Sequence, residues 1–155
     1  MEHGGTETQR SDALSGDVIG ACIEVHRHLG PGLLESTYEQ CLGYELNLRG
    51  FEVQKQLQIP LHYKGLDLEC GCRVDLLVNR QLLIEVKAVE RLLPVQEARM
   101  ITYLKLMGLP LGLLVNFHVP ALRHGLRRLV NSSPVPSAPP RLRVDPSDPT
   151  RPRSA

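Results

Sequence analysis

Apolar and polar residues alternate in two neighbouring stretches near the middle of the chain, residues 66–78 and 82–88. Because successive side chains of a β-strand point to opposite faces, this period of two predicts two strands. A short polar segment, Asn79–Gln81, separates them. A loop of three residues keeps the apolar positions of both strands on one face of the sheet, whereas a two-residue loop would not. The pattern therefore predicts a β-hairpin.

In that register Asp75 lies directly opposite Glu85, so both carboxylates point to the same face of the sheet, and Lys87 shares that face. Two carboxylates this close repel each other unless a positive charge lies between them. Mg²⁺ prefers such oxygen ligands, and a neighbouring lysine can orient an attacking water and offset charge on a phosphate. The alternative interpretation is a solvated sheet face with a surface ion pair, because short motifs also match by chance.

Helical and extended patterns surround the hairpin. Apolar residues recur every three or four positions in three segments, which predicts helices over residues 12–29, 34–49 and 96–107. Further strands, the last of them a short strand or helix, are predicted over residues 53–63, 111–117 and 123–130. A helix thus lies between the strand that carries Lys87 and the next strand, which predicts an α/β core with a central mixed β-sheet flanked by helices.

Composition divides the chain into three parts. Residues 1–11 are polar, and residues 131–155 contain seven of the twelve prolines, so both ends are expected to be disordered. Residues 12–130 are expected to form one domain. The chain has no apolar run of about 18 residues and no apolar signal core, which predicts a cytoplasmic protein without a membrane span.

Net charge and cysteine content limit the kinds of binding site that the sequence predicts. The net charge is +1, of which residues 131–155 contribute +2, leaving −1 for the rest, so nucleic acid would have to bind through a local patch. Cys70 and Cys72 fall on the apolar face of their strand, which predicts reduced core residues and not zinc ligands or a disulfide.

A second motif, GLLESTY at residues 32–38, fits the pattern G-x-x-E-x-x-Y. Together with ELNLRG, the strand pair RVDLLV and LIEVKAV, and LLPVQEARMITYLKLMGLPLGLLVNF, it makes the chain resemble the bacterial GxxExxY proteins, a branch of the PD-(D/E)XK nuclease superfamily. The resemblance extends from about Ile19 to Val130. It implies a restriction-endonuclease-like core, and it implies the catalytic residues Glu35, Asp75, Glu85 and Lys87.

The resemblance also implies a cofactor and substrate contacts. Mg²⁺ or Mn²⁺ would be held by the acidic residues and a main-chain carbonyl, namely Asp75, Glu85, Val86 and Glu35. Tyr38, Arg99 and Tyr103 would position the substrate. Related sequences carry glutamine where this chain has Arg99, and two interpretations of Arg99 are open: it binds a phosphate, or it pairs with a catalytic carboxylate and competes with the metal.

Two functions remain open from the sequence. The first is a metal-dependent nuclease that hydrolyses DNA phosphodiester bonds, with RNA as an alternative substrate and with a homodimer or an unidentified protein partner not excluded. The second is a catalytically silent nucleic-acid-binding or protein-interaction module on the same fold, in which Arg99 neutralises the acidic cluster.

Overall fold

The structure is a computed structural model that describes residues 3–132, with side chains described for residues 8–68 and 72–132. The predicted tail therefore lies outside the described residues, apart from positions 131 and 132. In chain order the elements are α1 (His3–Leu29), α2 (Glu35–Leu48), β1 (Val53–Tyr63), β2 (Leu66–Val78), β3 (Leu82–Lys87), α3 (Pro94–Met107), β4 (Leu111–Asn116), the 3₁₀ helix η1 (Leu122–Gly125) and β5 (Leu126–Val130).

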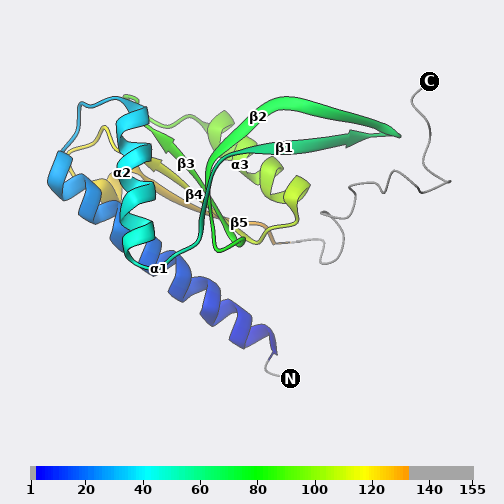
Figure 1. Cartoon of the computed structure of the whole chain (residues 1–155), viewed down its shortest axis with the longest axis horizontal. Helices are drawn as coiled ribbons and strands as arrows, with labels where there is room; N and C mark the ends of the chain where they lie inside the picture. Colours follow the sequence, from blue (N-terminus) through cyan, green and yellow to red (C-terminus); the bar gives the residue numbers. More distant parts are fainter. Residues whose placement is uncertain (1–2, 133–155) are drawn as a thin grey trace.

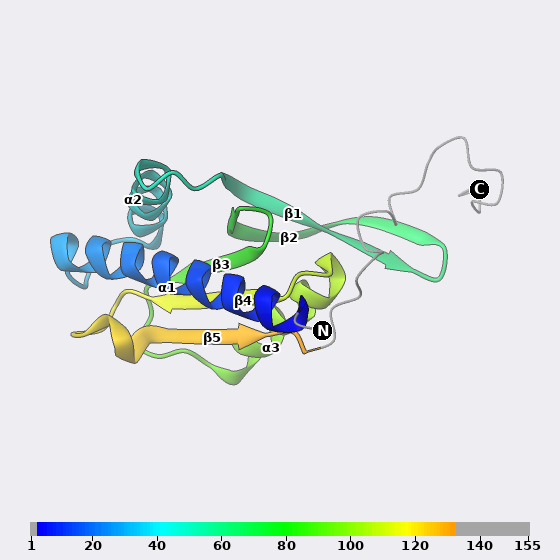
Figure 2. The same ribbon diagram turned by 90° about the horizontal axis from the view of Figure 1, so that it is seen from below.

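The five strands form one mixed sheet in the order β1-β2-β3-β4-β5. Only β3 and β4 run parallel, and α3 connects them; the other neighbours are antiparallel. Helices α1 and α2 cover one face of the sheet and α3 covers the other, while the β1–β2 hairpin extends beyond the body of the molecule (Figures 1 and 2). The predicted α/β core with a central mixed sheet flanked by helices is confirmed.

Two apolar clusters, one on each face, hold the layers together. The larger joins α1 and α2 to the sheet through residues such as Val18, Leu42 and Ile84. The smaller lies under α3 and includes Leu83, Met100 and Leu104. Strand β4 is buried on both sides, as its continuous apolar sequence indicates, and β3 is buried from Leu82 to Val86 although its sequence includes Glu85. The site described below is therefore built partly on a strand that is buried on both faces.

The turn between β2 and β3 has the predicted length. Val78 pairs with Leu82, which leaves three residues in the loop, and the Val78 carbonyl accepts a hydrogen bond from the Gln81 amide at 3.0 Å. Asn79 and Arg80 both adopt positive φ angles, 49° and 56°, which close the turn tightly. The register that places Asp75 level with Glu85 is thus confirmed.

Strand β2 differs from the prediction in its outer half. Val74 belongs to the cluster under α3, whereas Leu76 lies in the cluster under α1 and α2, so the buried face changes at Asp75. Beyond that point Leu66 and Leu68 are exposed, because the hairpin extends past the helices. The prediction that Cys72 is a core residue is wrong, since its side chain is exposed. The side chain of Cys70 lies outside the described residues.

Helix α1 is longer than its apolar pattern indicates. It begins at His3, so residues 3–11, which were predicted to be disordered, are helical. Once a helix has formed, each added residue gains a backbone hydrogen bond without a new nucleation step, and a polar, exposed extension needs no apolar stripe. Within the part of the chain that the structure describes, no helix is long and apolar enough to cross a membrane.

The close contact between η1 and β4 gives a test of the fold. A Cβ added at Gly125 would overlap the carbonyl oxygen of Asn116, and a backbone atom cannot move aside as a flexible side chain can. We expect Gly125→Ala to lower the free energy of unfolding by about 1–3 kcal/mol, measured by urea denaturation. Gly16→Ala is the matched control, because nothing lies within 4 Å of its added Cβ. Equal stability of the two variants would contradict the packing described here.

Candidate active site

Strands β2 and β3 separate where the two acidic residues meet. Their backbone pairing stops at Leu76 and Ile84. Beyond it, side chains take the place of backbone partners: the Val86 amide donates to Asp75 Oδ2 at 2.7 Å, and the Asp75 amide donates to Glu85 Oε1 at 3.1 Å. Each carboxylate is thereby fixed by the strand opposite its own. The gap between the strands holds both acids in one place.

The lysine of the pattern lies beside this pair. Lys87 Nζ is 3.7 Å from Glu85 Oε2, and both side chains are largely buried. Burial, and after it the negative charge of Asp75, raises the pKa of Glu85 to about 7, against the opposing effect of Lys87. The protonated form of Glu85 is therefore favoured relative to that of an exposed glutamate. The cluster carries more negative charge than its single lysine can offset.

Arg73 has a different partner from the one that the extended hairpin register predicts. In that register Arg73 would lie opposite Lys87, but the pairing of β2 with β3 ends before Arg73, whose partner in the sheet is Gln58 of β1. The reason is the separation of β2 from β3, which leaves the outer half of β2 paired with β1 alone. Lys87 is therefore the cation that the strands bring to the acidic pair.

Helix α2 adds two carboxylates to the cluster. Glu35 is the first residue of the helix, and its charge contributes to the raised pKa values of Glu39 and Glu85. Glu39 lies one turn further along, and burial, followed by the nearby Asp75, raises its pKa. Gln56 Nε2 donates to Glu39 Oε2 at 2.6 Å and to Asp75 Oδ1 at 3.4 Å. This amide links α2 to β2.

Glu39 was not identified from the sequence, nor was the contact of Gln56 with the acidic residues. A signal existed for Glu39, because it is four residues after Glu35 and so lies on the same face of the helix. None existed for Gln56, whose position depends on a local irregularity in β1.

Tyr38, which was predicted to position the substrate, lies in the core and not on the surface of the candidate site. Its side chain is fully buried and stacks on Phe117 at a centroid distance of 4.6 Å. Its hydroxyl donates to the Gly30 carbonyl and accepts from the Leu33 amide at 3.1 Å, and it makes no hydrogen bond with Glu35. Tyr38 instead fixes the turn before α2, and so fixes the place where Glu35 begins the helix.

Helix α3 brings Tyr103 and Arg99 to the other face of the sheet. Tyr103 is 7% exposed, and burial, then its hydrogen bond with the Cys72 thiol and the charge of Glu85, raises its pKa to about 12. Arg99 lies one turn earlier and is exposed. Among the described side chains no ion pair joins Arg99 to a carboxylate. Arg99 therefore does not neutralise Asp75 or Glu85 in this structure.

The end of β4 fixes the strand that carries Lys87. The side-chain amide of Asn116, which is buried, donates to the Val89 carbonyl at 2.9 Å and accepts from the Val89 amide at 3.0 Å. The next residue, Phe117, donates its backbone amide to the Lys87 carbonyl at 2.9 Å. Asn116 thus has a structural role, holding the segment that leaves the candidate site.

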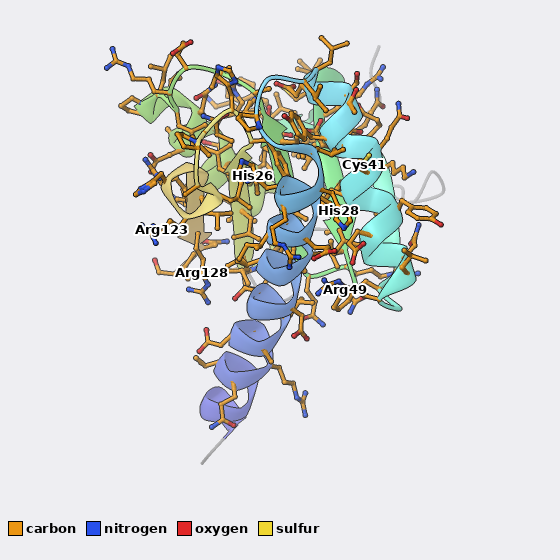
Figure 3. The ribbon with its side chains drawn as sticks, turned by 90° about the vertical axis from the view of Figure 1, so that its left-hand side faces the viewer. His26, His28, Cys41, Arg49, Arg123 and Arg128 are labelled. Atoms are coloured by element: carbon orange, nitrogen blue, oxygen red, sulfur yellow. The ribbon has the colours of Figure 1, made fainter. Side chains whose placement is uncertain are left out.

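The histidines near the end of α1 have local partners. Buried His26 makes a hydrogen bond through Nε2 with the Val119 carbonyl at 2.8 Å, and His28 pairs with Glu24 at 2.8 Å. Figure 3 shows His28 and Cys41 on the face formed by α1 and α2. A cavity of about 590 Å³ lies there, and none of the candidate catalytic residues lines it.

The comparison with family models decides the classification. The model described as PD-(D/E)XK nuclease superfamily matches residues 12–129. The chain belongs to the PD-(D/E)XK nuclease superfamily. No significant match was found among curated proteins or among solved structures. Membership makes nuclease chemistry on a nucleic acid the activity that the family suggests.

PD-(D/E)XK nucleases generally use divalent metals, and the residues present fit such an ion. Among the described residues no three His, Cys, Asp or Glu side chains converge as ligands. Mg²⁺, however, is usually held by one or two carboxylates and several waters. Asp75 and Glu85 would supply those carboxylates, and the hydrogen bond from the Val86 amide to Asp75 places Val86 beside the pair. Burial, and after it the charge of Asp75, raises the pKa of Glu85, so an added cation beside the pair would favour its ionised form.

The buried acid makes stability depend on pH. Because the folded-state pKa of Glu85 is above its ordinary value of 4.5, folding favours the protonated form, and metal-free protein should lose stability as pH rises from about 4.5 through about 7. Glu85→Gln keeps an acceptor for the Asp75 amide but cannot ionise. We expect it to exceed the wild type in stability by about 3 kcal/mol above pH 8, and to match it near pH 4.

Urea denaturation in a chelating buffer across this pH range measures the difference. Glu52→Gln is the control, because it removes the same charge at an exposed position just before β1, beside Arg80 in the turn between β2 and β3. Parallel pH profiles for the wild type and Glu85→Gln would contradict the charge imbalance inferred here.

Proposed function

We propose that this protein is a metal-dependent nuclease that hydrolyses phosphodiester bonds in DNA, and that it belongs to the GxxExxY branch of the superfamily. The observation that carries the proposal is the pair of carboxylates, Asp75 and Glu85, fixed in the gap between two strands with Lys87 beside them. A solvated surface ion pair would not need burial, or two backbone amides directed at the acids.

Each residue of the cluster has a role in this proposal. Asp75, Glu85 and the Val86 carbonyl hold Mg²⁺ or Mn²⁺, and Glu35 contributes directly or through water. When bound, the ion supplies positive charge that offsets the charge developing on the phosphate oxygens. Lys87 Nζ donates a hydrogen bond that orients the attacking water for in-line displacement.

Substrate contacts come from the exposed rim of α3. Arg99 is free of the acidic cluster among the described side chains, and its planar guanidinium suits a phosphate. Tyr103 lies one turn after Arg99 on α3 and is hydrogen-bonded to the Cys72 thiol. The chain has only six Phe and Tyr residues and no Trp, and three of them (Tyr38, Tyr103 and Phe117) are buried. Few aromatic rings remain for stacking on unpaired bases, which favours duplex DNA as the substrate.

The catalytically silent module requires Arg99 to occupy the place of the metal. An ion pair between Arg99 and Asp75 or Glu85 would have favoured that function, and none joins them in the described part of the chain. The near-neutral charge of the domain remains compatible with either function, since a local patch is sufficient for weak, salt-sensitive binding.

Loss of either strand carboxylate should abolish activity. Asp75→Asn and Glu85→Gln keep acceptors for the backbone amides, so folding should persist. We expect both variants to reduce cleavage of plasmid and linear DNA at least about 100-fold, and to weaken Mg²⁺ binding in calorimetry to a similar degree. Glu52→Gln should retain both properties. A wild-type protein that neither binds Mg²⁺ nor cleaves DNA would contradict the nuclease proposal.

Replacement of Arg99 separates phosphate binding from metal competition. In an Asp75→Asn background, which should not cleave, we expect Arg99→Gln to weaken DNA binding about 3- to 10-fold and to reduce the salt slope by about one. Fluorescence anisotropy at several salt concentrations measures both. Lys105→Gln, an exposed cation near the other end of α3, is the control. A gain of Mg²⁺ affinity on replacing Arg99 in the wild-type background would instead favour the silent module.

A further inference from the structure

Strand β1 has an irregular backbone at one position inside the strand. Gln56 adopts a φ angle of 50°, in the left-handed region that residues other than glycine rarely occupy. Its neighbours on both sides pair in register with β2, but the pair between Gln56 and Asp75 is missing from the pairing of these two described strands. The irregularity is therefore confined to the residue that stands level with the acid of the candidate active site.

Packing does not explain this conformation. The side chain of Gln56 is exposed, so no apolar contact forces the backbone into the left-handed region. The register shift between Gln58 and Pro60 in the pairing of β1 with β2 is a separate feature further along the strand. Strained backbone conformations persist where the surrounding structure imposes them, and they concentrate at functional sites.

The contacts of the Gln56 side chain supply a reason. One amide nitrogen carries two hydrogens, and here it donates to Glu39 Oε2 at 2.6 Å and to Asp75 Oδ1 at 3.4 Å. The other oxygen of Asp75, Oδ2, accepts from the Val86 amide at 2.7 Å. The carboxylate of Asp75 thus accepts a hydrogen bond on both oxygens, and the Gln56 amide donates to both acids and so offsets part of their mutual repulsion.

We propose that Gln56 is a positioning residue of the active site, whose amide orients the Asp75 carboxylate and connects it to Glu39 on α2. This inference rests on the proposed function, because the orientation of Asp75 matters only if that carboxylate holds a cation. The left-handed backbone of Gln56 turns the amide toward both acids, where an ordinary extended residue would direct its side chain along the alternating pattern of the strand.

Three variants separate the amide from the backbone. Gln56→Ala removes the amide and keeps an L-residue in the left-handed conformation. Gln56→Gly removes the amide and relieves the conformation, because glycine occupies positive φ at little cost. Gln58→Ala removes the same kind of side chain from an exposed position on the same strand, where no contact with the acids exists among the described side chains.

The experiment measures Mg²⁺ affinity by calorimetry, melting temperature without metal, and cleavage of plasmid DNA, for the wild type and all three variants. We expect both Gln56 variants to bind Mg²⁺ about 10- to 100-fold more weakly than the wild type, the range typical of residues that orient a metal ligand. We expect Gln56→Gly to melt about 2–4 °C above Gln56→Ala. Gln58→Ala should match the wild type in Mg²⁺ affinity and cleavage.

The outcomes distinguish the inference from the function on which it rests. If Gln56→Gly bound Mg²⁺ as tightly as the wild type, the inference would be overturned and the proposed function would stand. The Gln56 amide would then not be needed for metal binding. An equal loss in Gln58→Ala would also overturn it, since the effect would then belong to β1 in general. A wild type that binds no Mg²⁺ would overturn the proposed nuclease and this inference together.

Discussion

Repulsion between Asp75 and Glu85 is the constraint around which the middle of the molecule is built. Two acids at the same level of adjacent antiparallel strands, with one of them 8% exposed, are unfavourable by themselves. Strands β2 and β3 separate at this point. Backbone amides that would otherwise pair across the two strands donate to the carboxylates instead. The pKa of Glu85, raised to about 7, shows that these two hydrogen bonds and Lys87 compensate the charge only in part.

A common anchor at the end of β4 holds the parts of the site in place. Phe117 stacks on Tyr38, which fixes the start of α2 and therefore Glu35, and the Phe117 amide is bonded to Lys87. Asn116 holds the segment that follows β3. The helix that carries Glu35 and Glu39 and the strand that carries Glu85 are thus both held by two adjacent buried residues, Asn116 and Phe117. Sites carried on such rigid elements keep their geometry better than sites on loops.

The sequence predicted the features that depend on local pattern and on the turn. Alternation fixed the faces of β3, and a three-residue turn fixed the register that brings Asp75 level with Glu85. The prediction of which residues are buried failed where tertiary structure overrides the local pattern. The outer half of β2 has apolar residues for which no helix provides cover, and the buried face changes at Asp75. The resemblance implied Tyr38 as a substrate-positioning residue, but a sequence motif does not tell an outward side chain from a buried one.

The same charge imbalance links metal binding to protons. In the proposed nuclease, a protonated Glu85 would have to release its proton before it could ligate a cation, so Mg²⁺ binding should strengthen as pH rises through about 7. Without the ion, the ionised carboxylate is expected to lower the stability of the fold by about 3 kcal/mol, a substantial part of the 5–15 kcal/mol typical of a domain. A cation bound beside the two carboxylates would offset that loss, and it would then stabilise the folded state as well as serve the reaction.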